Sequence, residues 1–307
     1  MFKDFKNKFF KLKNIKIFYK IGGKGKPILL LHGYPQTHFM WSKIADQLAK
    51  KFTVIIPDLR GYGQSMSPKG DKNHKTYSKR EMAKDMYLLM KSLGHLKFSV
   101  AGHDRGGRVA HRLARDYRNN VIKLSVLDIC PTLDMYQSTD KEFATVYFHW
   151  FFLIQPFDFP ERMIKQNPAL WMDNCLQKWS KGFDFKKARN EYLKYFKKDE
   201  NIHASCEDYR AGATIDLVHD RKDKNKKFIV ATEPHILHQM KKNEPNKIFL
   251  VAPGSDGSCA CSNCPYMELN TLEKLRNCLV DLSPKINISN KLILKAKKPL
   301  NLMLNLS

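Results

Sequence analysis

Short apolar runs alternate with longer amphipathic stretches over the first part of the chain. The apolar runs lie at residues 28–31, 54–56, 98–101 and 124–127, and each has the length of a buried strand. Apolar positions at helical spacing predict helices between them, at 40–50, 79–94 and 106–117. Strands alternating with helices at this interval predict a parallel sheet with helices on both faces. Candidate chemistry is therefore expected at the carboxyl ends of these strands.

The strand signal disappears from residue 134 to about residue 217. Aromatic-rich segments with helical spacing replace it, and they are interrupted by Pro156, Pro160 and Pro168. Because proline ends or kinks a helix, this region is predicted to form several short helices. We interpret it as a helical cap over the sheet, with its aromatic residues mostly in the cap core.

A charged stretch at 220–224 separates the cap region from a third kind of pattern. This last region has two strand-like runs and one helical pattern, at 227–232, 247–252 and 269–279. The opening residues 1–13 interleave lysine with aromatic residues, which predicts an edge strand and not the apolar core of a signal peptide. The chain is accordingly divided into an α/β core at 1–132, a cap at 133–218, a junction at 219–225 and a C-terminal segment at 226–307.

The composition narrows the classes of partner. With 54 lysines and arginines against 30 acidic residues, the 307-residue chain carries a formal charge of +24. The lysines are scattered from Lys3 to Lys298, so we expect a solvated basic surface and no specific nucleic-acid partner. No run approaches the ~18 apolar residues of a membrane span, so no membrane partner is expected. Seven cysteines without a secretory signal predict reduced thiols in a cytoplasmic protein.

Four motifs follow the predicted strands at their carboxyl ends. They are His32-Gly33-Tyr34-Pro35, PDLRGYGQS at 57–65, GHDRGG at 102–107 and Leu127-Asp128. The carboxyl ends of parallel strands meet at one edge of a sheet, so these motifs are expected to lie close together.

Asp104 lies in the middle of the third motif, between a predicted strand and a predicted helix. A sharp turn of this kind holds its middle side chain in a strained, exposed position, and the helix N-terminus favours an anionic group. A carboxylate there can attack saturated carbon and form an ester that water later cleaves. The backbone N–H groups of Tyr34 and Arg105 would then form the oxyanion hole. The alternative is that Asp104 only caps the helix. His32 and His103 are interpreted as structural residues that bond the loop backbones.

Six longer motifs occur in order along the first 220 residues. They are HGYPQTHFMW at 32–41, PDLRGYGQS at 57–65, GHDRGGRVAHR at 102–112, LDICPT at 127–132, HWFFLIQP at 149–156 and CEDYRAGATID at 206–216. With these motifs, residues 1–220 resemble the haloacetate (fluoroacetate) dehalogenase family of α/β-hydrolases. Epoxide hydrolases share the first two motifs, whereas Asp104 followed by Arg105, with Arg108 one turn further, favours the dehalogenase branch. The implied fold is a doubly wound parallel α/β sheet with a helical cap.

The resemblance implies roles for the residues that match these motifs. Asp104 would be the nucleophile that displaces halide from the α-carbon of a 2-haloacid. Arg105 and Arg108 would clamp the substrate carboxylate, to which planar guanidinium groups are suited. Asp128 would orient a catalytic histidine. The plain alternative is that the two arginines are ordinary surface cations.

The cap would supply three hydrogen-bond donors to the departing halide. The resemblance assigns this role to His149, Trp150 and Tyr209, which would aim their donors where negative charge develops. The alternative for His149 and Trp150 is packing within the cap. No cofactor is implied for this reaction, and the partner is a small haloacid; a homodimer is left open.

The family's mechanism needs one further residue, a histidine near the C-terminus that activates water against the ester. It usually lies in a Gly-His pair after a late strand, and no such pair follows Gly102-His103. The later histidines, none of them in that context, are His111, His149, His203, His219, His235 and His238. A chain with the nucleophile but without this base is expected to alkylate itself and stop. His235 or His238, after a strand-like run, is an alternative base.

The C-terminal segment carries motifs of a different family. KKFIVATEPHILHQMKKNEPNKIFLVAP, CACSNCPYMELNTLEKL and the final LKAKKPLNLMLNLS, all within residues 226–307, resemble the C-terminal end of quinolinate synthase. In that family the cysteine before Pro-Tyr-Met, here Cys264, ligates a [4Fe-4S] cluster, and Cys261 would be its redox-sensitive neighbour. The family places the other two cluster ligands in domains that this chain lacks, so a cluster is not expected here. The late strands of the hydrolase sheet are expected to be missing. This tail would either substitute for them or leave the sheet with an unpaired edge.

Three functions therefore remain open from the sequence. The first is a hydrolase of the haloacetate dehalogenase type, impaired because the catalytic histidine is missing. The second is an iron–sulfur protein of NAD biosynthesis or a quinolinate synthase fragment. The third is an inactive fusion protein. We favour the first for ancestry and fold.

Overall fold

The computed structural model describes residues 1–180, 186–222, 227–230 and 248–251. By its internal contacts the chain divides into two units, Met1–Asp223 and Lys224–Ser307. The residues of the motifs around Asp104 all belong to the first unit.

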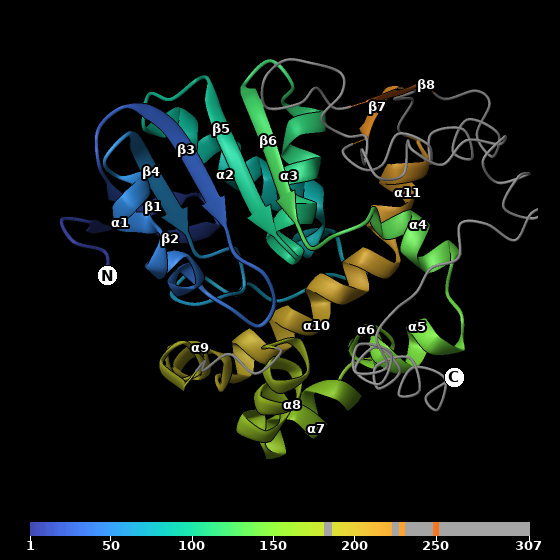
Figure 1. Ribbon diagram of the computed structural model, residues 1–307. Helices are drawn as coiled ribbons and strands as arrows, with labels where there is room; N and C mark the ends of the chain where they lie inside the picture. The colour runs from blue at the N-terminus through green and yellow to red at the C-terminus, as the bar shows by residue number, and fades with distance from the viewer. Residues whose placement is uncertain (181–185, 223–226, 231–247, 252–307) are drawn as a thin grey trace, which may run out of the picture. The chain divides into compact units, whose positions relative to one another are not determined.

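A six-stranded mixed sheet forms the centre of the first unit (Figure 1), with the strand order β1-β2-β4-β3-β5-β6. The strands are β1 Lys6–Leu12, β2 Ile15–Gly22, β3 Lys26–Leu31, β4 Phe52–Pro57, β5 Phe98–His103 and β6 Val121–Leu127. The last four in this order are parallel neighbours, whereas β1 and β2 are antiparallel. The predicted α/β fold class is confirmed. Strand β2 was not predicted, because its lysines at positions 16 and 20 interrupt the apolar pattern.

Successive residues of the central strands pack on opposite faces of the sheet. Leu29 and Leu31 of β3 belong to one buried cluster, together with residues of α2 Lys79–Ser92 and α3 Arg105–Asp116. Leu30, between them, belongs to a second cluster with Trp41 and Ala45. The helices on the two faces therefore cover both sides of the sheet, as the strand composition predicts.

The prediction of one continuous helix at 40–50 is wrong. The structure has a 3-10 helix at His38–Lys43 and a short α1 at Ala45–Leu48. Ile44 separates them with φ −114 and ψ −14, and its N–H donates to the carbonyl of Trp41 in a tight turn. The apolar spacing was real, but this local turn interrupts the helical hydrogen-bond pattern.

Eight helices follow β6 in the described part of the first unit and form the predicted cap. They are α4 Thr132–Gln137, α5 Lys141–Val146, α6 Phe148–Leu153, α7 Phe159–Gln166, α8 Pro168–Ser180, α9 Lys186–Phe196, α10 Asp199–Ala213 and α11 Ile215–Arg221. Helix α10 is the centre of the cap, because it contacts α6, α7, α9 and α11. Figure 1 shows α10 passing across the arrowheads of β3, β5 and β6, so it faces the strand ends that carry the motifs.

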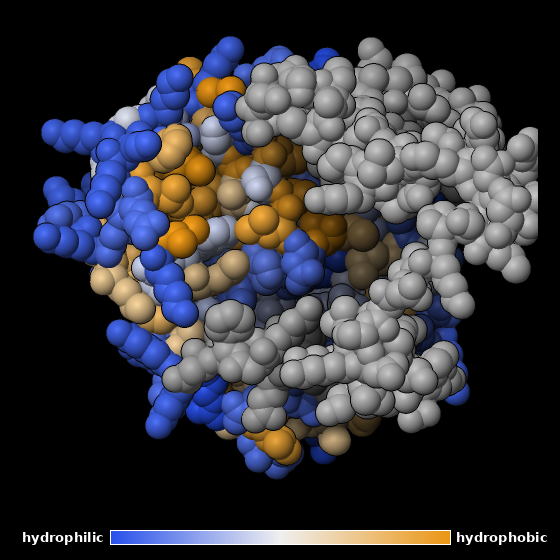
Figure 2. Space-filling model, viewed as in Figure 1, coloured by the Kyte–Doolittle hydropathy of each residue, from blue (hydrophilic) through white to orange (hydrophobic). Residues whose placement is uncertain are grey.

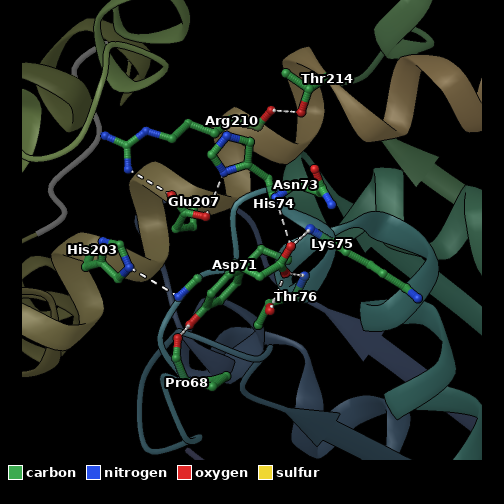
Figure 3. A network of polar contacts seen from close by, with 12 residues as sticks. Pro68, Asp71, Asn73, His74, Lys75, Thr76, His203, Glu207, Arg210 and Thr214 are labelled. Atoms are coloured by element: carbon green, nitrogen blue, oxygen red, sulfur yellow. Dashed lines mark hydrogen bonds and ion pairs between the residues drawn. The ribbon is translucent and has the colours of Figure 1, made fainter.

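A buried ion network links α10 to α7 and to the loop before α2. Arg210 donates to Glu161 Oε1 at 2.6 Å and to Glu207 Oε1 at 2.9 Å. The other oxygen of Glu207 lies 2.8 Å from Nδ1 of His74 in that loop, as Figure 3 shows. Burial by itself raises the pKa of Glu161. Hydrogen bonds with His203 and Arg210 lower this pKa by more than burial raises it, so it lies below its ordinary value. The network thus fixes the cap on the core with mutually compensated charges.

Replacing Arg210 with alanine is expected to destabilise the protein by about 3 kcal/mol, because it leaves two buried carboxylates without their cation. Urea unfolding measures this free energy. The matched control is Arg189→Ala, which breaks the more exposed pair with Asp173 on the cap and is expected to cost less than about 1 kcal/mol. Equal losses in the two variants would contradict the structural role of the network.

Strand β6 is an exposed edge of the sheet that the described strands form. In the order of the six-stranded sheet it is the last strand, and six of its seven residues are exposed. Its apolar side chains include Ile122, which is 57% exposed, and Val126, which is 41% exposed. In the view of Figure 2, apolar surface lies over the strands of the sheet. An unpaired apolar edge favours pairing with other chains.

Replacing Val126 with lysine is therefore expected to reduce self-association, because a charge on an edge strand opposes edge-to-edge pairing. Light scattering at rising protein concentration and high salt measures this self-association. Val146→Lys is the matched control, since Val146 is a 54% exposed valine on the cap and the substitution adds the same charge. If both variants reduced scattering equally, net charge and not the β6 edge would be the cause.

In the second unit the structure describes only two strands. They are β7 Lys227–Val230 and β8 Ile248–Val251, and they pair in parallel. Both fall within the strand-like runs predicted from the sequence. The predicted helix at 269–279, the alternative bases His235 and His238, and the candidate cluster ligand Cys264 with its neighbour Cys261 lie outside the described residues.

Candidate functional site

Asp104 occupies a strained turn between β5 and α3. Its backbone has φ 47 and ψ −118, in a region that non-glycine residues rarely adopt. The turn is crowded: a Cβ at Gly102 would lie 2.3 Å from the carbonyl oxygen of Gly106. A Cβ at Gly106 would lie equally close to the carbonyl oxygen of His32. Only glycine fits at these two positions, and strain of this kind is characteristic of functional sites.

The Asp104 carboxylate is anchored through one oxygen. Oδ2 accepts a hydrogen bond of 2.8 Å from the backbone N–H of Tyr34. The side chain makes no capping bond to α3, so the alternative role as a helix cap receives no support from the geometry. Anchoring one oxygen fixes the direction of the other, which has no hydrogen bond to a described residue. The Arg105 N–H, the second predicted oxyanion donor, begins α3 directly after Asp104.

A cavity of about 480 Å³ opens in front of Asp104. Six of the residues predicted from the sequence line it: Tyr34, Asp104, Arg108, Asp128, His149 and Trp150. Gln36, His103 and Tyr147 also line the cavity but were not predicted as site residues. Gln36 lies within the motif HGYPQTHFMW, and Tyr147 lies two positions before HWFFLIQP. This place in the sequence is the signal that could have indicated them.

Arg108 is a buried cation in the cavity wall without an acidic partner. It is 5% exposed, and one guanidinium nitrogen donates to the carbonyl of Cys130 at 2.7 Å and to Thr132 Oγ1 at 2.8 Å. Its Nε has no partner, and within the described ranges no carboxylate lies within ion-pair distance of it. Burial, and then the charge of Arg105, lower the pKa of Arg108. A desolvated cation of this kind favours an incoming anion.

Arg105 does not share this environment with Arg108. Its Nε donates to Asp208 Oδ2 at 3.1 Å and one terminal nitrogen donates to Oδ1 at 2.7 Å. It is 1% exposed and is not among the residues that line the cavity. Neither arginine is a surface cation, so that alternative is wrong. The structure separates the two arginines that the resemblance places together on the substrate carboxylate.

The three cap residues predicted to bind halide meet in one cluster. The Tyr209 ring centre lies 5.8 Å from that of His149 and 6.2 Å from that of Trp150. Tyr34 contacts the same ring at 5.2 Å. The Tyr209 hydroxyl is buried and has no hydrogen-bond partner in the described part of the chain. Burial, followed by the negative charge of Asp104, raises the pKa of Tyr209 well above its ordinary value, so this hydroxyl is a neutral donor near the nucleophile.

Asp128 lies at the end of β6 with φ 56, and its side chain is 82% exposed. Its Oδ2 lies 3.8 Å from Nε2 of His103. His103 Nδ1 is buried without a partner, so the expected bonds from His103 to the loop backbone are not seen. His32 does make such bonds, because its Nε2 accepts from the N–H of Leu59 at 3.0 Å.

Three further histidines that follow Gly102-His103 in the first unit lie in helices. His111 is in α3, whereas His203 and His219 are in the cap helices α10 and α11. The described residues contain no group of three or more His, Cys, Asp or Glu side chains that could hold a metal ion. No described helix is long and apolar enough to cross a membrane.

Comparison with known proteins shows two distinct regions of similarity. The family described as alpha/beta hydrolase fold matches residues 26–224, and the family described as Quinolinate synthetase A protein matches residues 200–305. A fluoroacetate dehalogenase from Burkholderia sp. is 43% identical over 73% of this chain and 74% of its own length. A quinolinate synthase from Microcystis aeruginosa is 47% identical over 34% of this chain and 35% of its own length. Both resemblances noted from the sequence are confirmed.

Solved structures agree with the fold. A putative alpha/beta hydrolase from Nostoc sp. superposes with a TM-score of 0.72 at 43% identity, covering 91% of this chain and 99% of its own. A putative epoxide hydrolase from Pseudomonas aeruginosa gives a TM-score of 0.70 at 33% identity, covering 90% and 96% respectively.

Proposed function

Because the chain belongs to the α/β-hydrolase fold family, we propose that it acts on a 2-haloacid with Asp104 as its nucleophile. The observation that carries this proposal is the anchored carboxylate: one oxygen accepts the Tyr34 N–H, and the cavity opens in front of the other. The 43% identity to the Burkholderia fluoroacetate dehalogenase supports the substrate class.

In the first step the substrate carboxylate binds Arg108, the cation of the cavity wall that has no carboxylate partner among the described residues. This places the α-carbon in front of Asp104. The free oxygen of Asp104 forms a bond to the α-carbon while the carbon–halogen bond breaks, and the halide leaves with the bonding electron pair. Donors of the cap cluster formed by His149, Trp150 and Tyr209 stabilise the charge that develops on the halide.

In the second step water attacks the carbonyl carbon of the ester, and the Tyr34 N–H stabilises the oxyanion. This step needs a base that takes the proton from water. Asp128 lines the cavity and would orient such a base, but its carboxylate is largely exposed and lies 3.8 Å from Nε2 of His103. We therefore propose that the reaction is impaired and stops at the ester.

The stoichiometry of halide release tests both steps. With excess fluoroacetate or chloroacetate, we expect one halide per chain followed by arrest. Continuous release would show that a base is present and would contradict the proposed arrest. No release, together with an unmodified Asp104, would contradict the haloacid activity itself.

The match to quinolinate synthase favours a second candidate, an iron–sulfur role for the C-terminal segment. The chain spans only 35% of the length of the Microcystis relative. Anaerobic reconstitution with iron and sulfide tests this role. A broad visible charge-transfer band that is lost in Cys264→Ser would support it, and a colourless protein would contradict it.

A further inference from the structure

A free cysteine lies in the wall of the cavity that opens in front of Asp104. Cys130 lines this cavity together with Asp104 and Arg108. It is exposed and forms no disulfide, whereas the other free cysteines of the described part, Cys175 and Cys206, are buried. The proposed haloacid reaction uses only the carboxylate of Asp104. The cavity therefore contains a second potential nucleophile that this reaction leaves unused.

Arg108 links this cysteine to a place where an anion can bind. One guanidinium nitrogen of Arg108, Nη1, donates to the backbone carbonyl of Cys130 at 2.7 Å. Arg108 is 5% exposed and lines the same cavity, and its Nε has no partner among the described residues. A desolvated cation in a cavity wall favours an incoming carboxylate. An anion that binds there is therefore brought next to the segment that carries the thiol.

The backbone around Cys130 is fixed at this wall. Cys130 follows the end of β6 at Leu127, and Asp128 between them lines the same cavity. The Nη1 atom of Arg108 that bonds to the carbonyl of Cys130 also donates to Thr132 Oγ1 at 2.8 Å. These two bonds tie the segment after β6 to α3, the helix that begins directly after Asp104. The thiol and the carboxylate therefore face one bound ligand from two neighbouring strand ends.

We propose that Cys130 is a second alkylation site of this cavity, used by 2-haloacids with a readily displaced halide, such as iodoacetate. Arg108 binds the carboxylate of the reagent. The thiolate sulfur of Cys130 forms a bond to the α-carbon while the carbon–iodine bond breaks. Iodide leaves with the bonding electron pair, and the proton of the thiol passes to water. The product is a thioether, which, unlike the ester on Asp104, has no carbonyl at the new bond for water to attack.

The leaving group decides between the two nucleophiles. Fluoride and chloride depend on hydrogen-bond donors in the transition state, which the proposed function assigns to the cap. Iodide needs little such help, and a thiolate is a softer and more polarisable nucleophile than a carboxylate. Once Asp104 or Cys130 carries a carboxymethyl group, the carboxylate of that group occupies Arg108 and blocks a second haloacid. Each cavity therefore takes one label. The inference rests on the proposed binding of haloacids at Arg108, but not on alkylation of Asp104.

The test compares the alkylation of Cys130 by iodoacetate and by iodoacetamide in the full-length chain, followed by mass spectrometry of the Cys130 peptide. The two reagents have the same leaving group, and only iodoacetate is charged. The ratio of the two rates in the folded protein is divided by the ratio for the same peptide in the urea-unfolded chain. We expect the folded protein to favour iodoacetate about tenfold by this measure, because a charge-assisted contact guides the anion.

Competition and substitution at the cation test the guidance by Arg108. Acetate has the carboxylate but no leaving group, so excess acetate should slow the labelling of Cys130 by iodoacetate, and acetamide should not. In Arg108→Met, the preference for iodoacetate should fall to that of the unfolded chain. Arg108→Lys keeps the charge and should keep part of the preference. Unfolding curves show whether these variants are folded.

Three controls separate this guidance from other effects. Arg60→Met removes another buried arginine, which pairs with Asp85 at 2.7 and 2.8 Å, and should leave the preference unchanged although the net charge falls equally. Asp104→Asn should label Cys130 at least as fast as the wild type, because the competing nucleophile is gone. Cys206 should stay unlabelled in the folded chain, because it is buried and burial raises the pKa of its thiol.

Each outcome decides the inference. Equal rate ratios in the folded and unfolded chain, or labelling of Cys130 that acetate does not slow, would overturn it. A preference kept in folded Arg108→Met would overturn it as well, because the guiding charge would then lie elsewhere. If Cys130 is labelled as expected but chloroacetate never modifies Asp104, the proposed nucleophile fails and this inference stands. If Asp104 is modified and Cys130 shows no preference, the inference fails and the proposed function stands.

Discussion

In Asp104→Asn, the rate of halide release from chloroacetate is expected to fall at least about a thousandfold. The amide oxygen of asparagine can still accept the Tyr34 N–H that holds Asp104 Oδ2 at 2.8 Å, so the turn should keep its geometry. The remaining amide nitrogen cannot donate an electron pair to carbon as a carboxylate oxygen does. Single-turnover assays of halide release measure the effect.

The matched control for this variant is Asp173→Asn, which makes the same chemical change at a carboxylate of the cap that pairs with Arg189. It should release halide at the wild-type rate. Unfolding curves of the two variants separate loss of chemistry from loss of fold. Wild-type release by a folded Asp104→Asn variant would show that another group is the nucleophile.

Arg108→Met is expected to have the second largest effect, on binding. The half-saturating concentration of chloroacetate should rise by about 10- to 100-fold, because a charge-assisted pair with the substrate carboxylate is lost. Chloroacetamide, which carries no charge, should be affected far less. Single-turnover assays with both compounds measure the difference. Similar changes for both compounds would contradict the assignment of Arg108 to the carboxylate.

The stability of Arg108→Met provides an independent test. Arg108 is buried, its Nε has no partner, and no described carboxylate compensates its charge. Methionine of similar length removes a desolvated cation, so stability should be unchanged or higher despite the loss of three hydrogen bonds, to Cys130, Thr132 and Met135. A residue that weakens the fold while it supports binding is characteristic of a functional site.

The core of the fold was predictable from local pattern. The central strands are uninterrupted apolar runs, and GHDRGG at 102–107 specifies a turn that only small residues allow, so Asp104 was located without any contact information. Strand β2 was missed because it lies near the sheet edge and its apolar pattern is interrupted by the exposed Lys16 and the partly buried Lys20. The break at Ile44 was missed because it depends on a single backbone turn.

The partners of the site residues were not predictable from local pattern. Arg105 pairs with Asp208, which is 103 positions away in the sequence, and neither the helical spacing of Arg105 and Arg108 nor the motif around Asp208 indicates that pair. The sequence places both arginines on α3, but the environment of each depends on what the cap presents to it. The different surroundings of the two residues therefore became visible only through tertiary contacts.

The exposed end of the described sheet agrees with the two regions of similarity along the chain. Asp128 and strand β6 are largely exposed, and similarity to the α/β-hydrolase family ends at residue 224. Similarity to the quinolinate synthetase A family covers residues 200–305 and so overlaps the end of the hydrolase match. Asp104, the proposed nucleophile, and Arg108, the proposed partner of the substrate carboxylate, both lie before residue 200, which is why the first chemical step is proposed to survive and the second is not.

Mass spectrometry of the Asp104 peptide after incubation with chloroacetate tests the central claim most directly. The account predicts that this peptide gains the mass of one carboxymethyl group, that fragmentation places it on the Asp104 carboxylate, and that it persists after excess reagent is removed. A peptide that stays unmodified while halide is released, or a carboxymethyl group found on a cysteine or histidine instead, would contradict it.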